Sequence, residues 1–436
     1  YSRAGNNATA FNGKIFAWEG KNESDLKKTT VTPDMEASSF KASALGVLDS
    51  GTGAIKALSS VYEMTTEFVE EFMMNDVARY ADCINIHNHT ADWGGEYRHF
   101  PESLPMHASD IAVSYGGGKP IWCTEAGLQM FSGGEDGITP DGSQPLNARY
   151  AITSAVESLA EYGIYKHFYF IGRHFTERGN FGLFTSTHMP YASYNALSTL
   201  TNYLGKGKAR GVVRDLPDGV KGYVFDAGDY DAAVLYTTGA AKEYVQFNTA
   251  SDVTVIDVMG VEKNMRHTPK NKKVNIPVTI YPIIVKFDGH CDESNYYRRE
   301  FAEYDDVKVT SVPDAQRIIL RQRWQNTPIE RSEYQMERGT VYTIKLDVCN
   351  LAQKRLKGTI VPDVTEGLEL AGGGTVSYNV PAYSTQELEF RVKVKDGWTR
   401  SGRNFVSFGG TCGSAKISNS TAPVYVSDEG AEFNDT

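Results

Sequence analysis

The sequence predicts an α/β domain followed by two all-β domains. Strand-like and helix-like segments alternate over residues 1–205, which is typical of a parallel sheet or barrel. Short strands separated by turn residues follow over residues 206–288 and again over residues 289–436. We therefore expect part of a (β/α)8 TIM barrel, then an accessory antiparallel β-sandwich, then an immunoglobulin-like β-sandwich with an acidic tail.

The first 205 residues contain five strand–helix units. Apolar residues at helical spacing predict helices at residues 34–48, 61–79, 104–115, 146–162 and 193–204. Short apolar runs predict strands at residues 14–18, 54–59, 82–87, 120–124 and 167–171. A complete barrel has eight units, so we interpret these five as barrel strands four to eight. The first three strands are then expected from an upstream fragment or from a second chain.

The two all-β domains are expected to be small sandwiches joined by a polar link at residues 289–304. Predicted strands of the first sandwich are residues 221–226, 232–237, 253–257, 274–276 and 279–286. Predicted strands of the second are residues 307–312, 316–324, 340–348, 357–361, 384–394 and 404–408.

The composition excludes several classes of function. The net charge of −10 argues against nucleic acid as the main partner, because phosphate binding requires a basic face. No apolar run reaches the ~20 residues that span a bilayer. The aromatic share of 11% suits sugars, whose C–H faces stack on rings, although core packing accounts for most of these rings.

Cysteines and glycosylation sequons indicate the compartment. The five cysteines form no C-x-x-C pair, which argues against a structural zinc site. Cys349 and Cys412 could form a disulfide in the last domain, whereas Cys83 and Cys123 fit small core positions. N-x-S/T sequons permit glycosylation, so we expect a secreted or extracellular glycoprotein; they begin at Asn7, Asn22, Asn88, Asn419 and Asn434.

Two glutamates follow predicted strands at the end where barrel enzymes build their active face. Glu23 follows Asn22 just beyond the first strand, and Glu125 ends the apolar strand at residues 120–124. One carboxyl group can protonate a leaving oxygen, and Asn22 can bind a sugar hydroxyl next to the reacting carbon. A polar loop or helix cap would also explain Glu23, and a salt bridge would explain Glu125. Paired carboxyl groups at a barrel mouth favour glycoside hydrolysis.

These segments together resemble clan A glycoside hydrolases. Residues 18–23 (WEGKNE) resemble the W-E-x-x-N-E form of β-xylosidase-like and related members, and Trp18 opens it. The resemblance implies a retaining hydrolase of oligo- or polysaccharides, with Glu23 as general acid/base and Glu125 as nucleophile. It implies a carbohydrate substrate, and we expect no cofactor and no metal.

Further substrate-binding candidates follow from their position near strand ends. One member of the cluster formed by His87, Asn88 and His89 could bind the nucleophile carboxylate and stabilise its charge. A metal site is disfavoured in this cluster because no carboxylate or cysteine lies at a matching spacing in the sequence. Alternatives are a loop anchor for Trp93 and rim salt bridges for Arg173 and His174. The candidates are His87, Asn88, His89, Trp93, Trp122, Phe170, Arg173 and His174.

Two other functions remain open from the sequence. A non-catalytic extracellular structural or carbohydrate-binding protein could keep a glycosidase scaffold, since fold does not guarantee function. A transglycosylase would use the same two glutamates and differ only in what attacks the intermediate.

Overall fold

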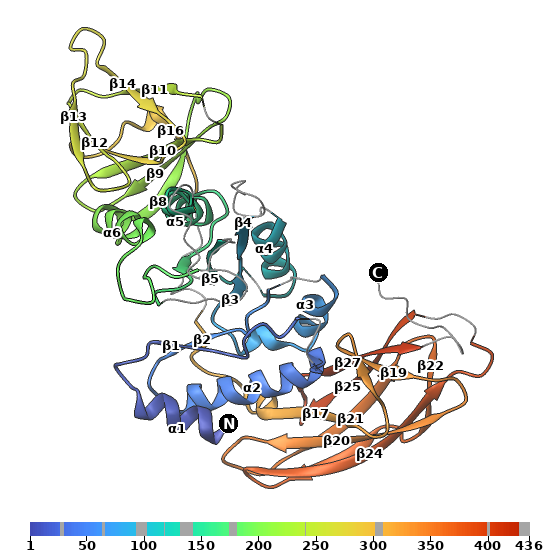
Figure 1. The fold of residues 1–436 in the computed structure, drawn as a ribbon. Helices are drawn as coiled ribbons and strands as arrows, with labels where there is room; N and C mark the ends of the chain where they lie inside the picture. The colour runs from blue at the N-terminus through green and yellow to red at the C-terminus, as the bar shows by residue number, and fades with distance from the viewer. Residues whose placement is uncertain are drawn as a thin grey trace. The chain divides into compact units, whose positions relative to one another are not determined.

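A computed structural model describes residues 1–26, 30–62, 66–92, 103–116, 118–130, 143–173, 181–239, 241–300, 308–398 and 402–426 (Figure 1). Within these residues the fold is mixed, with six α-helices and several β-sheets. The chain divides into two compact units. The first unit comprises Tyr1–Asn85, Ser109–Pro120 and Tyr304–Thr436, and the second comprises Ile86–Ala108 and Ile121–Glu303.

The first unit begins with strand–helix segments. Strands β1 (Ala17–Glu19) and β2 (Ile55–Ala57) pair in parallel, and Ala57 forms a further parallel bridge with Cys83. Helix α2 (Pro33–Asp49) connects β1 to β2. Its first turn carries Pro33, Asp34 and Glu36, residue types that favour a helix N-terminus. The parallel pairing is therefore produced by a helical crossover, as βαβ units require.

The C-terminal part of the first unit is a β-sandwich. One sheet has the strand order β17-β20-β24-β22 and the other β18-β19-β27-β25-β21-β23, and both contribute to one apolar core. Helix α2 packs on β17 (Ile318–Trp324) and β27 (Ser420–Val426). The remaining strands of the sandwich are β18 (Ile329–Glu330), β19 (Glu333–Met336), β20 (Val341–Asn350), β21 (Leu356–Val364), β22 (Leu368–Gly372), β23 (Val376–Val380), β24 (Ser384–Val394), β25 (Gly402–Cys412) and β26 (Ala415–Lys416), which pairs with β25.

The second unit contains a three-stranded sheet with the order β3-β5-β7. Strand β3 (Ile84–His87) enters this unit with its last two residues, and β5 (Ile121–Ala126) lies between it and β7 (Lys166–Tyr169). Strands β5 and β7 are parallel. The carboxyl ends of the three strands therefore provide a shared edge for side chains.

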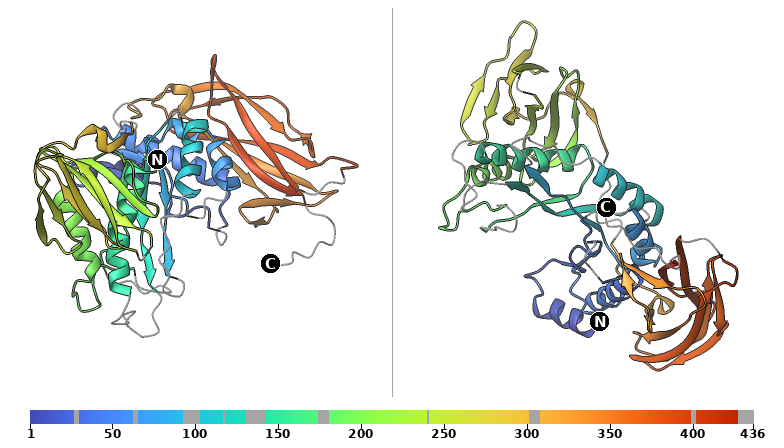
Figure 2. Two further views of the ribbon diagram at one scale, coloured as in Figure 1. Left: turned by 90° about the horizontal axis from the view of Figure 1, so that it is seen from above. Right: turned by 45° about the vertical axis from the view of Figure 1, so that its right-hand side comes forward.

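An antiparallel sandwich completes the second unit, with strand orders β13-β12-β15-β10-β9-β8-β16 and β11-β14. Helices α5 (Ser143–Ala160) and α6 (Ala192–Leu204) share a buried core with this sandwich, and they lie along one face of it in Figure 2. Its strands are β8 (Lys208–Val213), β9 (Val220–Asp226), β10 (Asp231–Thr237), β11 (Glu243–Asn248), β12 (Val253–Ile256), β13 (Glu262–Met265), β14 (Lys273–Val278), β15 (Ile283–Lys286) and β16 (Tyr296–Arg298).

The structure corrects several expectations at the level of elements. The segment at 289–304, expected as a link, contributes strand β16, which pairs with β8 and buries Cys291 and Tyr296. Helix α1 (Ser2–Ala10) was not expected. The helix expected at residues 61–79 is described as α3 (Thr66–Met73) and a 3-10 turn after Asp76, whose left-handed φ of 59° ends the α-helix.

Two further findings concern covalent links and membranes. All five cysteines are free, so the disulfide considered between Cys349 and Cys412 does not form. Among the described helices, none is long and apolar enough to cross a membrane.

Candidate active site

Glu125 is the penultimate residue of β5, the central strand of the parallel sheet in the second unit. The strand begins with buried residues because Ile121, Trp122 and Cys123 face the interior. The Glu125 side chain keeps 25% of its surface exposed. The fold thus carries a carboxylate to the open end of an otherwise apolar strand, where it can meet a ligand.

Two histidines at and just beyond the end of the neighbouring strand β3 approach this carboxylate. His89 Nε2 lies 3.2 Å from Glu125 Oε2, and His87 Nδ1 lies 3.5 Å from the same oxygen. Between them, the Asn88 backbone N–H donates to the Glu125 carbonyl at 2.8 Å. Residues two apart on an extended chain point to the same side, so this spacing brings both imidazoles to one carboxylate.

Two aromatic rings contact His89. The His89 ring centre lies 5.0 Å from that of Phe170 and 5.4 Å from that of Phe181, and these two phenylalanine rings are 5.5 Å apart. All three pairs are edge-to-face, the arrangement that ring quadrupoles favour. The aromatic contacts therefore hold the imidazole that faces the carboxylate.

A glycine permits this close packing. A Cβ on Gly127 would overlap the Phe170 backbone oxygen and would lie 2.8 Å from a ring carbon of Phe181. Phe170 is fixed next to this position because its N–H donates to the Ala126 carbonyl at 2.8 Å. The small residue after Ala126 thus allows the ends of β5 and β7 to approach each other.

Two buried, uncharged side chains contact the backbone at Glu125 and Asn88. The Cys123 thiol donates to the Glu125 carbonyl at 3.4 Å, and burial raises the pKa of this thiol far above its ordinary value. Tyr150, fully buried on α5, places its hydroxyl 3.5 Å from the Asn88 carbonyl. In the described part of the second unit, Glu125 and the two histidines can therefore supply a nucleophilic carboxylate or a set of metal ligands.

Glu23 lies in the first unit, in the loop that follows β1. Its backbone N–H donates to Ser60 Oγ at 3.0 Å, and the next N–H, of Ser24, donates to the Ser60 carbonyl at 3.2 Å. Asp25 accepts a hydrogen bond from the Tyr62 N–H at 2.8 Å. Glu23 itself has a left-handed φ of 46°. The loop is thus fixed to the segment after β2, with the Glu23 side chain partly exposed and Asn22 exposed.

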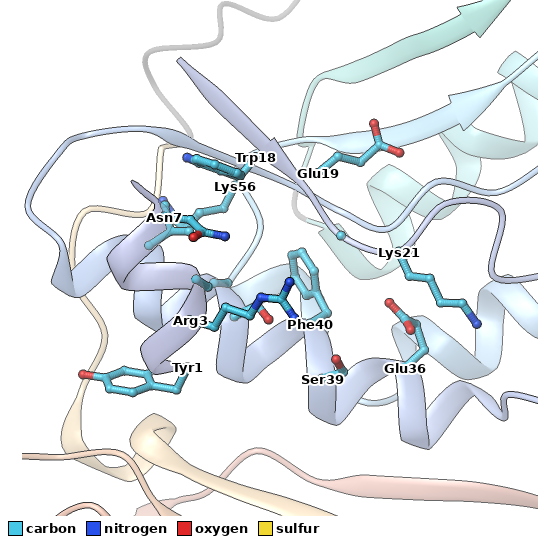
Figure 3. Close-up of a pocket in the computed structure, with 15 residues that line it drawn as sticks. Tyr1, Arg3, Asn7, Trp18, Glu19, Lys21, Glu36, Ser39, Phe40 and Lys56 are labelled. Carbon is cyan, nitrogen blue, oxygen red and sulfur yellow. The ribbon is translucent and has the colours of Figure 1, made fainter. Parts of the chain in front are cut away.

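Trp18 lies beside a hollow of about 640 Å³ in the first unit (Figure 3). Its ring centre is 6.3 Å from that of Phe11, and it packs on the apolar cluster that includes Ala8 and Val47. Figure 3 shows Lys21 and Glu36 together at the other end of this hollow. The surroundings of Trp18 are those of a side chain packed between β1 and α1.

Two of the remaining candidates, Trp122 and Arg173, lie among the described residues of the second unit. Trp122 is buried, with its ring centre 6.2 Å from that of Phe168 and Lys166 Nζ 5.6 Å from it. Arg173 is exposed and lines a second hollow of about 490 Å³ together with His188. Trp93 and His174 lie outside the described residues.

Sequence reasoning missed two residues of this site. Phe181 contacts His89 from a loop 92 positions further along the chain, and no local pattern marks that contact. Gly127 could have been noticed, because a glycine directly after a buried strand often marks a close approach of backbones. A metal site is disfavoured by the sequence because no carboxylate lies near the two histidines along the chain. In the folded structure this reason is wrong, because the Glu125 carboxylate lies next to them.

Comparisons with known proteins concern the fold. No protein-family model matches the sequence, and no curated protein matches it. A glycoside hydrolase family 30 endoxylanase from Clostridium papyrosolvens C71 is similar, with 15% identity, a TM-score of 0.47, and coverage of 66% of this chain and 71% of that chain. A family 30 subfamily 8 xylanase from Clostridium acetobutylicum has 14% identity, a TM-score of 0.45, and coverage of 65% and 72%.

A third similar structure covers more of the chain. It is a β-porphyranase of glycoside hydrolase family 86 from the human gut bacterium Bacteroides plebeius, with 12% identity and a TM-score of 0.43. The similarity covers 97% of this chain and 82% of that chain. Because these TM-scores are below 0.5, the functional proposal depends on the side chains at Glu125.

Proposed function

We propose that this protein is a retaining glycoside hydrolase that cleaves O-glycosidic bonds of an oligo- or polysaccharide. Glu125 is the proposed nucleophile and Glu23 the proposed general acid/base. The observation that carries the proposal is the partly exposed Glu125 carboxylate, which ends a parallel strand and has His89 at 3.2 Å and His87 at 3.5 Å. A nucleophilic carboxylate must be fixed in direction, and two imidazole nitrogens close to one of its oxygens supply that condition.

The proposed scaffold is the second part of a (β/α)8 barrel. In this proposal β1, β2, β3, β5 and β7 are its fourth to eighth strands, and an upstream segment or a second chain supplies the other three. The parallel pairings β1–β2, Ala57–Cys83 and β5–β7 support it. The position of Glu23 after β1 and of Glu125 at the end of β5 agrees with catalysis at the carboxyl ends of barrel strands.

The proposed reaction has two displacements. In the first, Glu125 attacks the anomeric carbon while Glu23 gives its proton to the leaving oxygen, so the glycosidic bond breaks and an ester to Glu125 forms. In the second, Glu23 takes a proton from water, which attacks the same carbon and releases Glu125. Retaining enzymes hold the two carboxyl groups about 5–5.5 Å apart. The proposal therefore requires Glu23 to act on the bond that Glu125 attacks.

The neighbouring residues have distinct proposed tasks. His87 and His89 orient the nucleophile, and Phe170 offers a ring for the apolar face of a sugar. Asn22, exposed beside Glu23, binds a hydroxyl next to the reacting carbon. The net charge of −10 is compatible with a neutral polymer as the substrate.

A secreted or extracellular location remains part of the proposal, with glycosylation restricted by the fold. Asn7 and Asn22 are exposed, whereas Asn88 is fully buried and the Asn419 amide donates to the Met74 carbonyl at 2.9 Å. A glycan on Asn22 would stand next to Glu23 and obstruct the proposed site. Among the described sequons, Asn7 is therefore the compatible one.

The test is hydrolysis of a panel of aryl glycosides by the full chain together with any segment that completes the barrel. Glu125→Gln should abolish turnover, and the first product should keep its anomeric configuration by NMR. Glu293→Gln, which changes an exposed glutamate in the same unit, is the control and should retain activity. Normal turnover by Glu125→Gln, or an inverted product, would refute the mechanism.

A further inference from the structure

The two histidines and the glutamate at the ends of β3 and β5 form an arrangement that orientation of a nucleophile does not require. One ring nitrogen of His87, one of His89 and one carboxylate oxygen of Glu125 lie within 4.8 Å of one another. Two neutral imidazoles and one carboxylate are a common ligand set for first-row transition metals. We propose that His87, His89 and Glu125 bind a divalent transition-metal ion, with Zn²⁺ as the best match.

The distances are compatible with a tetrahedral ion. Ligand atoms about 2.1 Å from a tetrahedral zinc are about 3.4 Å from each other, whereas neighbouring ligands of an octahedral ion are about 3.0 Å apart. The two measured nitrogen–oxygen separations are 3.2 Å and 3.5 Å. Their values lie on both sides of the tetrahedral separation, so an ion can enter with small movements of the side chains.

Burial also suits such a site. The His87 side chain has no exposed surface, His89 has 11% and Glu125 has 25%, so exposure increases from the first ligand to the third. An ion held on the buried histidines would remain accessible from the Glu125 side. Three ligands from one unit are the protein contribution in zinc sites that are not purely structural, and the ion takes its further ligand from elsewhere.

Contacts between aromatic rings reduce the conformational entropy that the three ligands lose when they bind an ion. His87 and His89 have their ring centres 6.0 Å apart at 76°, and Phe170 and Phe181 support His89. The backbone hydrogen bond from Asn88 to Glu125 fixes the two strand ends to each other. Ligands that are already in place lose little conformational freedom on binding, which increases affinity.

Metal binding does not depend on the proposed glycosidase activity, and the two can be measured apart. If Glu125 is the nucleophile, one carboxylate cannot ligate an ion and attack a sugar at the same time. A bound ion would then inhibit hydrolysis and be released as the substrate binds. This regulatory consequence rests on the proposed function, whereas the binding itself does not.

The experiment is calorimetric titration of the chelator-treated full chain with ZnCl₂, followed by CoCl₂ titration monitored by visible absorption. We expect one equivalent to bind, with the intense cobalt spectrum of a tetrahedral site. Loss of a residue that only hydrogen-bonds to a metal ligand costs about 10–100-fold in affinity, so loss of a ligand itself, in His89→Ala or Glu125→Gln, should weaken binding by about 100-fold or more. Glu125→Gln preserves the side-chain volume and serves if His89→Ala does not fold.

His267→Ala is the matched control, because His267 faces Asp252 at 2.7 Å on the sandwich of the same unit. It should leave the strong site unchanged. Affinity that is equal in wild type, His89→Ala and Glu125→Gln would overturn the proposal, as would loss of the site in His267→Ala. If the protein hydrolyses glycosides but binds no zinc, the metal site is refuted and the proposed function is not. If the protein binds one equivalent of zinc tightly but hydrolyses no glycoside, the metal site is supported and the proposed function is not.

Discussion

At the scale of the residue, the chemistry is concentrated on Glu125 because strand β5 carries it from a buried start to a partly exposed end. The sequence was sufficient to predict that Glu125 and the histidines end neighbouring strands, since apolar runs mark strands and their ends. It could not predict that Phe170 and Phe181 support His89, because that contact joins loops distant in sequence. The local pattern predicts which residues reach the edge, and tertiary packing decides which of them meet.

Gly127 provides a prediction about this packing. Gly127→Ala should lower stability by about 1–3 kcal/mol, the usual cost of overpacking, because the new methyl group meets the Phe170 backbone and the Phe181 ring. Displacement of these rings should also reduce hydrolysis. Urea unfolding provides the measurement, and Gly172→Ala is the control, since a Cβ at Gly172 meets no atom of the described residues within 4 Å. Equal stability of the two variants would contradict the packing described at Gly127.

At the scale of the element, helix α2 carries charged residues into the core of the first unit. Asp34 is buried at its start, where Tyr334 donates to the carboxylate at 3.4 Å. Lys41 is fully buried and donates to the Asn75 carbonyl, Ser418 Oγ and the Asn419 carbonyl at 2.9–3.0 Å. The helical period predicted α2 itself, but its polar contacts with the sandwich join residues that are 300 or more positions apart and could not be predicted.

Asp34 makes stability depend on pH. Burial raises the pKa of this carboxyl from 3.8 to about 7, so the folded state favours the protonated form. The contribution of protonated Asp34 to the free energy of unfolding is therefore fully present below the pKa that Asp34 has in the unfolded chain. It is lost as the pH rises through the pKa that Asp34 has in the folded protein. Between about pH 5 and about pH 8, this loss amounts to roughly 2–3 kcal/mol.

Asp34→Asn has no group to titrate at this position and should not show that loss. The free energy of unfolding of the variant should therefore increase relative to that of the wild type as the pH rises. Chemical denaturation at both pH values measures the difference, with Asp363→Asn as an exposed control in the same unit. Burial raises the pKa of Glu71 to about 8, so some pH dependence will remain in the variant. If the gap between Asp34→Asn and wild type is the same at both pH values, the raised pKa of Asp34 is wrong.

At the scale of the whole molecule, the order of strands and helices was predictable, but the division into two compact units was not. The first unit combines segments from both ends of the chain, and in the second the helices before Gly205 share a core with the sandwich after it. Which surfaces bury each other depends on packing across long sequence distances. The three-domain division stays a prediction made from the order of segments along the chain.

The free cysteines give a prediction for the whole chain. Denatured protein should react with five equivalents of iodoacetamide whether or not it is first reduced, because none of the five cysteines is paired. Mass spectrometry counts the adducts. Two fewer adducts without reduction, with Cys349 and Cys412 unmodified, would show the disulfide that the structure lacks.

The central claim is that Glu125 forms a covalent bond to a sugar. The most direct measurement is peptide mass spectrometry after incubation with a panel of 2-deoxy-2-fluoro aryl glycosides, which slow release of a glycosyl-enzyme. We predict one added glycosyl mass on the peptide that contains Glu125, and none in Glu125→Gln. Labelling of a different residue, or hydrolysis with no adduct at any residue, would contradict the account.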